Sequence, residues 1–390
     1  MSARCLIALC WMTVVSLTTG CDRSHSTSPH DQRVTVLRIW CHQGQEAENR
    51  AMRKIAEAFN AAHEPEGLRV EVSFFPDFHY TEKLSIAAAA NDVPDAFEID
   101  GPLVARFASA GWLQPLDPWI SEQDRADFLP TVLEQGTIDG HLYALGAFES
   151  AVVLYFDRAL FQKAGISVPQ DGVSWQWPEF LENCQRLLDA GIEPASLHMD
   201  DAADEWYTYA FSPVIWSGGG QLIESTKVPN VRRILSSPQN VRSLEAWQTL
   251  FKRSYAQSDP VDPNPFGNGK VAMDWSGHWM ARSHLETKGE RLGVMRLPRF
   301  DARSAAPCGS WTWAMSARSR HPDKAVKWIQ WVTSRDEGVI PMVQANGAIP
   351  ARRSAFSAFP EYSKSPYRIF REQLEQDAKP RPRTPVYASL

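Results

Sequence analysis

The sequence predicts an α/β protein of two lobes, in which each lobe is a mostly parallel sheet flanked by helices. Three observations lead to this prediction. Strand-like and helix-like stretches alternate from residue 34 to 113, as expected for parallel strands with helical connections. Residues 139–166 have the pattern of a chain that leaves one lobe and enters another. The length of 390 residues, 44% of them hydrophobic, is sufficient for two cores.

The N-terminus has the pattern of a bacterial lipoprotein signal over residues 1–20. Arg4 precedes an apolar run, residues 6–17, that is too short to cross a bilayer as a helix, and small residues lead to Cys21. Cys21 is therefore the expected lipidated residue. The polar residues 22–33 have no apolar period and predict a flexible tether. An ordinary signal peptide is the alternative interpretation.

The charge balance and the cysteines narrow the class of protein further. The chain carries 46 acidic and 40 basic residues, which argues against a nucleic-acid partner. No segment after the signal is long and apolar enough to span a membrane. Signal removal and lipidation would leave Cys41, Cys184 and Cys308, an odd count that permits one disulfide at most.

The first lobe is expected to begin with two strand–helix units and a third strand. The predicted strands are residues 34–40, 69–74 and 95–99, and the predicted helices are residues 46–62 and 84–90. Ligands of such sheets bind beyond the carboxyl ends of the strands. The loops that contain Trp40, His79 and Asp100 should therefore lie on one rim.

The crossing segment is defined by turn and cap signals. Asp139 and Gly140 stand between two short strand-like stretches, which predicts a hairpin. The apolar run of residues 151–156 predicts a strand that is buried on both faces. Asp157 can then cap a helix that ends before Gly165, where a left-handed residue is favoured.

This segment, from the hairpin through Leu-Tyr-Phe-Asp to Ala164-Gly165, resembles the first hinge of carbohydrate-binding proteins that serve ABC importers. Further phrases with the same resemblance are Pro94–Glu98, Phe107–Leu113, Phe266–Trp279, Cys308–Met315, Gly347–Arg352 and Pro380–Tyr387, after which family members commonly continue. The resemblance implies a periplasmic-binding-protein-like fold of type II. It also implies a first lobe of residues 34–147 with 308–349 and a second lobe of residues 148–307 with 350–390.

The resemblance also implies a set of sugar-binding residues. Trp279 matches the position where the family stacks an aromatic ring on a sugar, and the loop of Asp100 often touches sugar hydroxyls. Each has a structural alternative, namely a core tryptophan and a turn acid. The full expected set is Trp40, His79, Asp100, Glu149, Trp275, Trp279, Trp311 and Arg352. Cys41 follows the first strand and Cys308 begins a strand that returns to the same lobe, so these two form the expected disulfide pair.

Motifs of catalysis and cofactor binding are missing from the sequence. There is no His-Glu-x-x-His, no Gly-x-Ser-x-Gly and no paired cysteine spacing of a zinc site. We therefore expect a binding protein with no enzymatic activity, cofactor or metal. Acidic residues near the cleft could mimic a glycosidase pair, so a secreted glycosidase is one alternative. A lipoprotein that feeds a sensor is the other.

The expected function is capture of a sugar or oligosaccharide between the lobes and delivery to an ABC permease. Its partners would be the carbohydrate and the permease subunits, and its only membrane attachment the N-terminal lipid. The expected location is the cell envelope, on the outer face of the cytoplasmic membrane, which is the periplasmic side in a Gram-negative cell. We expect a monomer.

Replacement of the lipidation residue tests the anchor. Cys21→Ala should release the protein into the soluble fraction, because the acyl chains that hold it in the bilayer are then missing. Fractionation of cells followed by immunoblotting measures the distribution, and ligand affinity should be unaltered. Retention of the variant in the membrane fraction would contradict a lipid anchor.

Overall fold

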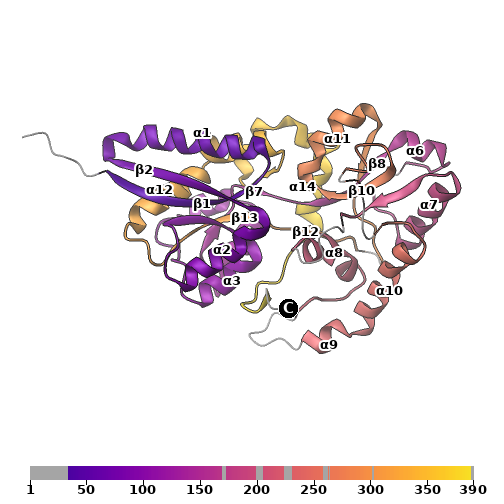
Figure 1. Ribbon diagram of the computed structural model, residues 1–390, viewed down its shortest axis with the longest axis horizontal. Coiled ribbons are helices and arrows are strands. Elements are labelled where there is room, and N and C mark those ends of the chain that lie inside the picture. Colours follow the sequence, from indigo (N-terminus) through magenta and orange to yellow (C-terminus); the bar gives the residue numbers. More distant parts are fainter. Residues whose placement is uncertain are drawn as a thin grey trace, which may run out of the picture. The chain divides into compact units, whose positions relative to one another are not determined.

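The structure is a computed structural model (Figure 1). Its two larger β-sheets, one in each lobe, organise the fold. The structure describes residues 34–168, 173–198, 205–223, 231–257, 262, 264–300 and 303–387. The predicted signal and tether, including Cys21, lie outside these residues. Within the described part, no helix has both the length and the apolar character needed to cross a membrane.

The first sheet has five strands in the order β2-β1-β3-β13-β6. Their bounds are β1 Thr35–Gln43, β2 Leu68–Pro76, β3 Ala96–Asp100, β6 Ala144–Leu145 and β13 Trp311–Met315. Strand β1 is parallel to β2 and β3, whereas β13 is antiparallel to both of its neighbours. The helices of this lobe are α1 Glu46–His63, α2 Asp77–Ala89, α3 Gly101–Ser109, α4 Glu122–Asp127, α5 Pro130–Gly136, α12 Pro322–Val332 and α13 Ile340–Asn346.

The second sheet has four strands in the order β11-β8-β10-β9. Their bounds are β8 Val152–Asp157, β9 Glu193–Ser196, β10 Val271–Gly277 and β11 Leu292–Met295. Here β8 is the strand that runs against its neighbours, and β9 is parallel to β10. The remaining α-helices are α6 Arg158–Lys163, α7 Trp177–Asp189, α8 Trp206–Ser217, α9 Val231–Leu235, α10 Pro238–Lys252, α11 Ala281–Lys288 and α14 Tyr367–Gln376.

Short pairings bring together the segments that connect the two sheets. Strand β7 (Phe148–Glu149) is antiparallel to β14 (Ile349–Pro350), and β12 (Ala306–Cys308) is parallel to β15 (Ala378–Pro380). An isolated bridge joins Ala151 to Cys308. The three places where the predicted lobe limits fall, near residues 148, 308 and 350, therefore lie side by side. The residue limits themselves stay a prediction. Short helices complete the chain: η1 Glu64–Glu66, η2 His278–Met280, η3 Gly289–Arg291, η4 Arg335–Val339, η5 Arg353–Ala358 and η6 Pro360–Ser363.

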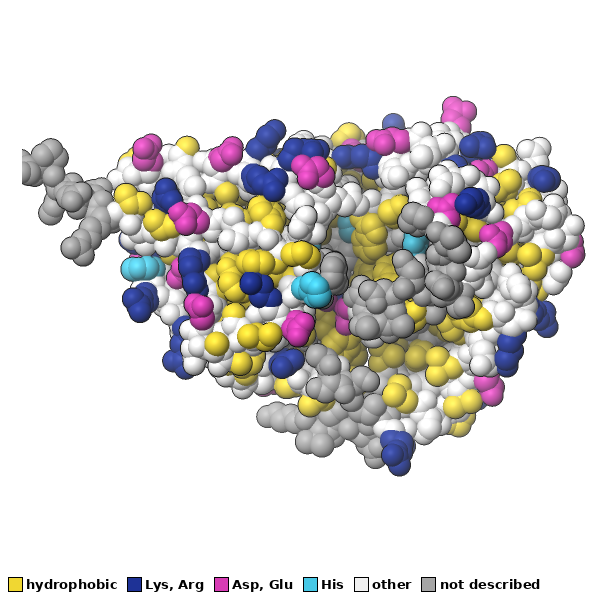
Figure 2. Space-filling model, in the orientation of Figure 1, with side chains coloured by type: hydrophobic (Ala, Val, Ile, Leu, Met, Phe, Trp, Pro, Cys, Tyr) yellow, Lys and Arg dark blue, Asp and Glu magenta, His cyan; other side chains and the backbone are white. Residues whose placement is uncertain are grey.

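Buried apolar side chains form three cores: one that extends across both sheets, one confined to the second lobe, and one between the first sheet and helices α2 and α3. The shared core joins Leu37 and Ile39 of β1 to Val153 and Tyr155 of β8. The second core combines the other face of β8 with α7, α8 and β10. Since β8 has apolar neighbours on both faces, its continuous apolar sequence is explained. On the drawn surface, hydrophobic side chains also gather around the hollowed middle of the molecule (Figure 2).

The local signals of the crossing segment are confirmed. Strands β4 (Thr137–Ile138) and β5 (His141–Leu142) form the predicted hairpin, with positive φ at Asp139 and Gly140. Asp157 caps α6 by accepting hydrogen bonds from the amides of Ala159 and Leu160, at 3.0 and 3.4 Å.

The predicted disulfide is wrong. Cys41, Cys184 and Cys308 are all buried free thiols. Cys308 is the last residue of β12, which pairs with β15, and only the next strand, β13, enters the sheet that contains Cys41. The break between β12 and β13 at Gly309, where φ is 118°, separates Cys308 from that sheet.

Asp157 provides a test of how the crossing is stabilised. Its other carboxylate oxygen lies 3.3 Å from Nζ of Lys288, and both side chains are 2% exposed. Asp157→Ala should lower the free energy of unfolding by about 3–5 kcal/mol, because it leaves a buried ammonium without its partner.

Ser121→Ala is the matched control, since Ser121 caps α4 with one hydrogen bond to the amide of Asp124 and faces solvent. That variant should lose only about 1 kcal/mol. Urea unfolding at neutral pH measures both changes. Equal losses in the two variants would contradict a special role of the buried pair.

Candidate functional site

The carboxyl ends of β1 and β3 bring a histidine–glutamate pair to the rim of the first sheet. Nδ1 of His42 lies 2.7 Å from Oε2 of Glu98, which also accepts the His42 amide hydrogen bond at 3.2 Å. The imidazole stacks on Trp311 of β13, with ring centroids 4.3 Å apart and planes 8° apart. Tyr80 donates a hydrogen bond to the Glu98 carbonyl at 2.7 Å. This rim combines a fixed polar pair with a partly exposed indole face.

An aromatic group on the second lobe consists of Trp206 and Tyr209 of α8 and Trp279 of η2. The ring of Trp279 lies 5.9 Å from Trp206 and 6.3 Å from Tyr209. Gly277 makes room for this arrangement, because a Cβ there would lie 2.2 Å from the Trp279 ring. The indole of Trp279 fills the space that a side chain at position 277 would need. Trp206 and Trp279 are both partly exposed.

Arg381 lies between these two groups and joins them. It donates bidentate hydrogen bonds to Asp100, the last residue of β3, at 2.5 and 2.7 Å. It also donates to Oε1 of Glu205, just before α8, at 2.9 Å. Its guanidinium lies 5.0 Å from the centroid of the Tyr209 ring. The order of groups along the site is therefore histidine–glutamate pair, Trp311, Asp100, Arg381 and the aromatic group.

A buried carboxyl lies behind Arg381. Glu149 of β7 is 0% exposed and accepts a hydrogen bond from Nε2 of Gln135 at 2.6 Å. Gln135 in turn accepts from the amide of Ser310 at 3.0 Å. Burial raises the pKa of Glu149 to about 7, although the hydrogen bond from Gln135 and the charge of Arg381 oppose the rise. A neutral carboxylic acid at the hinge is the form favoured at mildly acidic pH.

The predicted site residues of the first lobe have different surroundings. Trp40 is partly exposed and contacts Phe75 with ring centroids 4.8 Å apart, but it lies within β1, paired with Ser73 of β2, and not in a loop after the strand. His79 is exposed on α2, which begins at Asp77 rather than after the expected loop. Trp311 and Asp100 lie together, since they are paired across β13 and β3. Glu149 is near this group but shielded from solvent.

Trp275 is a core residue, which corrects its assignment to the site. It is 0% exposed, and its indole N–H donates to the carbonyl of Ala210 at 3.0 Å. Its ring contacts Phe211 and Trp247 in the second core. Every residue of β10 is buried, so Trp275 has no face toward a cleft.

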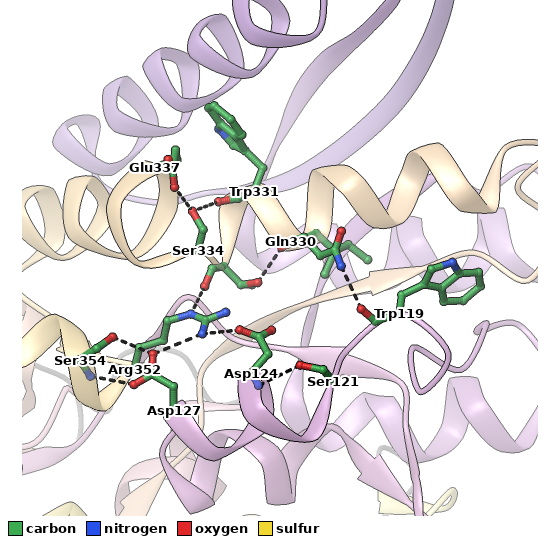
Figure 3. Close-up of polar contacts among 12 residues, drawn as sticks. Trp119, Ser121, Asp124, Asp127, Gln330, Trp331, Ser334, Glu337, Arg352 and Ser354 are labelled. Atoms are coloured by element: carbon green, nitrogen blue, oxygen red, sulfur yellow. Dashed lines mark hydrogen bonds and ion pairs between the residues drawn. The ribbon is translucent and has the colours of Figure 1, made fainter. Parts of the chain in front are cut away.

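Arg352 is a structural residue, which corrects a second assignment. Figure 3 shows its guanidinium among α4, the end of α12 and the start of η5. It donates to the carbonyl of Thr333 at 2.6 Å and to Asp124 at 2.7 Å, and it lies 4.0 Å from the Phe128 ring centroid. These contacts hold the segment that contains β14 and Arg352 against the first lobe.

Sequence reasoning missed Arg381, Glu205 and Tyr209. The phrase that contains Arg381 was noticed only as a family resemblance, and α8 has no motif. The aromatic-rich stretch Trp206-Tyr207-Thr208-Tyr209 at the start of an unassigned helix was the available signal. Aromatic side chains at a helix terminus are common both in cores and in ligand sites, so that signal is weak.

A polar cluster around Asp274 borders the aromatic group, since the ring centroids of His198 and Trp206 lie 6.2 Å apart. Asp274 is buried between His198 and His284, each 2.7 Å from one carboxylate oxygen. Within the described residues, no group of three or more potential ligands could hold a metal ion. One cavity of about 190 Å³ is lined by residues including Glu193 and Lys270, and another of about 210 Å³ by residues including Arg282 and Tyr367. Neither contains the site residues.

Comparison with known proteins identifies the family. The model of the bacterial extracellular solute-binding protein family matches residues 43–339. The chain belongs to this family. The solute-binding protein is 24% identical over 365 residues to the maltotriose-binding protein of Pyrococcus abyssi, covering 90% of this chain and 74% of that protein. It is 26% identical over 246 residues to the mannitol-binding protein of Pseudomonas aeruginosa, covering 60% of this chain and 55% of that one.

Solved structures of similar fold support the architecture of the solute-binding protein. The GacH receptor of Streptomyces glaucescens, described in complex with acarbose, superposes with a TM-score of 0.76 at 24% identity, covering 90% of this chain and 88% of that chain. A Thermotoga lettingae ABC-transporter solute-binding protein with bound α-D-tagatose gives 0.76 at 23% identity and 91% of both chains. The two-lobed fold of type II is therefore confirmed.

The buried carboxyl predicts a pH dependence of stability. The pKa of Glu149 is about 7 in the folded protein, against an ordinary value of 4.5. Between these values the folded state binds the proton more tightly than the unfolded state, so its stability falls as pH rises. Relative to Glu149→Gln, the parent should lose about 3 kcal/mol of unfolding free energy between about pH 4 and pH 8.

Urea unfolding of both proteins across this pH range measures the difference. Glu57→Gln, at an exposed position of α1, is the control and should show no such divergence from the parent. A difference between parent and Glu149→Gln that does not change with pH would contradict a protonated buried carboxyl.

Proposed function

We propose that this solute-binding protein captures an uncharged sugar or oligosaccharide between its lobes and delivers it to an ABC importer. The observation that supports this proposal is that an aromatic group on the second lobe and a hydrogen-bonding rim on the first lobe lie on either side of Arg381. One face of a pyranose presents C–H groups, which suit the negative face of an indole, while its hydroxyls need polar partners. The partly exposed rings of Trp279 and Trp206 supply the first kind of surface.

Asp100 supplies the second kind of surface, together with the pair of His42 and Glu98. Each carboxylate oxygen of Asp100 accepts one hydrogen bond from Arg381, and a second lone pair on each can accept from a sugar hydroxyl. A site with apolar walls and few oriented polar groups is typical of small-molecule binding. Two of the relatives are named for maltotriose and mannitol, which are uncharged and support this ligand class.

Closure of the lobes would couple capture to delivery. A ligand that contacts both Asp100 and Trp279 binds the closed form more tightly than the open form, and only this difference shifts the equilibrium between them. The permease would then recognise the closed form. We further propose that the protein acts in the cell envelope, attached through lipid on Cys21, with permease subunits as partners.

Two measurements separate this function from its alternatives. Chromatography of oligosaccharides after incubation with the protein would reveal new products if it were a glycosidase. Solute uptake by cells that lack the gene distinguishes an importer from a sensor, because a sensor protein would leave uptake itself intact when its ligand is supplied.

Trp279 provides the decisive binding test. A thermal-shift screen with maltotriose, mannitol and tagatose selects a ligand, and calorimetry then measures its affinity. Trp279→Ala should weaken binding by about 2–4 kcal/mol, as expected for loss of an aromatic anchor. Trp279→Phe should lose less.

Trp119→Ala is the control, because Trp119 is a partly exposed first-lobe tryptophan next to α12 rather than in the site. It should bind as the parent does. If no sugar in a broad panel raises the melting temperature, the proposed ligand class is wrong. If Trp279→Ala binds with the parent's affinity, the aromatic group is not part of the site.

A further inference from the structure

The segment that begins with β15 touches elements of both lobes. Strand β15 is parallel to β12, and the chain then continues past Arg381, Arg383 and Tyr387. Arg383 donates to the carbonyls of Glu134 and Thr137 at 2.7 and 3.1 Å, at the end of α5. Tyr387 donates to Glu205 at 2.5 Å. The segment of residues 378–387, here called the strap, is therefore held at several points.

Arg381 is the residue of the strap that connects the lobes. Asp100 ends β3 of the first sheet, and Glu205 immediately precedes α8, whose Tyr209, Ala210 and Val214 belong to the second core. One guanidinium binds both carboxylates. No other residue of the strap is bonded, within the part of the chain that the structure describes, to a side chain of both lobes.

Burial makes this connection energetically significant. The side chain of Arg381 is 5% exposed, that of Asp100 is 17% exposed and that of Glu205 is 37% exposed. A planar guanidinium matches a carboxylate through two parallel hydrogen bonds, which an ammonium cannot do. Separation of the lobes would have to break the bonds to one carboxylate and leave a largely buried charge with fewer partners.

The same cluster adjoins the ligand surfaces. The Tyr209 ring beneath the guanidinium contacts Trp279, and its hydroxyl lies 2.6 Å from Oγ of Ser150, which donates to the Gly309 carbonyl. The buried Nε of Arg381 has no hydrogen-bond partner among the described residues.

We propose that Arg381 is a positioning residue that latches the two lobes together in the absence of solute and orients Asp100 for the ligand. The open–closed equilibrium is then set partly by the protein's own C-terminal segment. A solute adds contacts to a pair of lobes that are already joined at one point. Loss of the guanidinium frees the lobes and leaves Asp100 without its orienting donors.

Distance measurements between spin labels test the latch without any ligand. Glu57→Cys on α1 and Glu179→Cys on α7 introduce exposed labelling sites on the two lobes. The soluble form beginning at residue 22 has only the buried Cys41, Cys184 and Cys308 as other thiols. Double electron–electron resonance then measures the distance between the two labels in the parent and in Arg381→Ala, Arg381→Lys and Glu205→Gln.

Arg381→Ala should increase the ratio of open to closed molecules about tenfold or more, as expected for the loss of charge-assisted hydrogen bonds. Arg381→Lys should give an intermediate ratio, because an ammonium keeps the charge but not the fork. Arg383→Ala is the matched control in the same strap. It loses contacts with Glu134 of α5 and Thr137 of β4, both in the first lobe, and should keep the parent's distance distribution.

If Arg381→Ala does not fold, Glu205→Gln still tests the latch. In Glu205→Gln the buried Arg381 keeps its pairing with Asp100, so this variant is expected to fold. This variant should also shift the distribution toward longer distances. An unaltered distribution in Arg381→Ala or, where that variant is unfolded, in Glu205→Gln would overturn the latch. An equal shift in Arg383→Ala would also overturn it, because the strap as a whole would then be responsible. If no sugar bound, the proposed function would be contradicted, but the latch would not, because the distance measurement uses no ligand.

Discussion

The fold depends on one geometrical constraint, namely that the chain passes between two sheets several times at one place. Backbone hydrogen bonds satisfy this constraint by pairing β7 with β14, Ala151 with Cys308, and β12 with β15. The reversed strand of each sheet, β13 in the first and β8 in the second, is the strand next to these pairings. A strand that enters from the other lobe starts at the opposite end of the sheet. It therefore runs antiparallel to the strands that are connected to one another by helices. The site residues Glu149, Trp311 and Arg381 all lie within or next to the crossing segments.

Local features of the sequence were predictable because their causes lie within a few residues. The turn at Asp139 and Gly140 depends on positive φ, and the cap at Asp157 depends on amides two and three positions away. The alternation of strands and helices likewise led to the correct fold class. The rim of the first lobe was partly predictable, since strand ends determine which loops meet, and Asp100 does lie at the end of β3.

The rest of the site could not be predicted, because its contacts join distant parts of the chain. Arg381 and Asp100 are 281 positions apart, and a single sequence contains no signal for such a pair. Trp275 and Trp279 show the same limit at short range. Trp275 lies in β10, which is buried on both faces, and Trp279 lies just beyond it in η2, so strand periodicity cannot tell which of the two faces a ligand. Arg352 was misassigned because its acidic partners, Asp124 and Asp127, lie in a different segment of the sequence.

The seating of Trp279 against Gly277 has a consequence for how ligand preference can change in evolution. The indole occupies the volume that any side chain at position 277 would need, so its rotational freedom is already reduced before a solute arrives. A platform that is immobilised in advance loses less entropy when a sugar stacks on it. Substitutions at position 277 would displace the platform altogether, whereas those at Trp206 would alter only its edge. Divergence in solute preference is therefore more accessible through α8 than through β10.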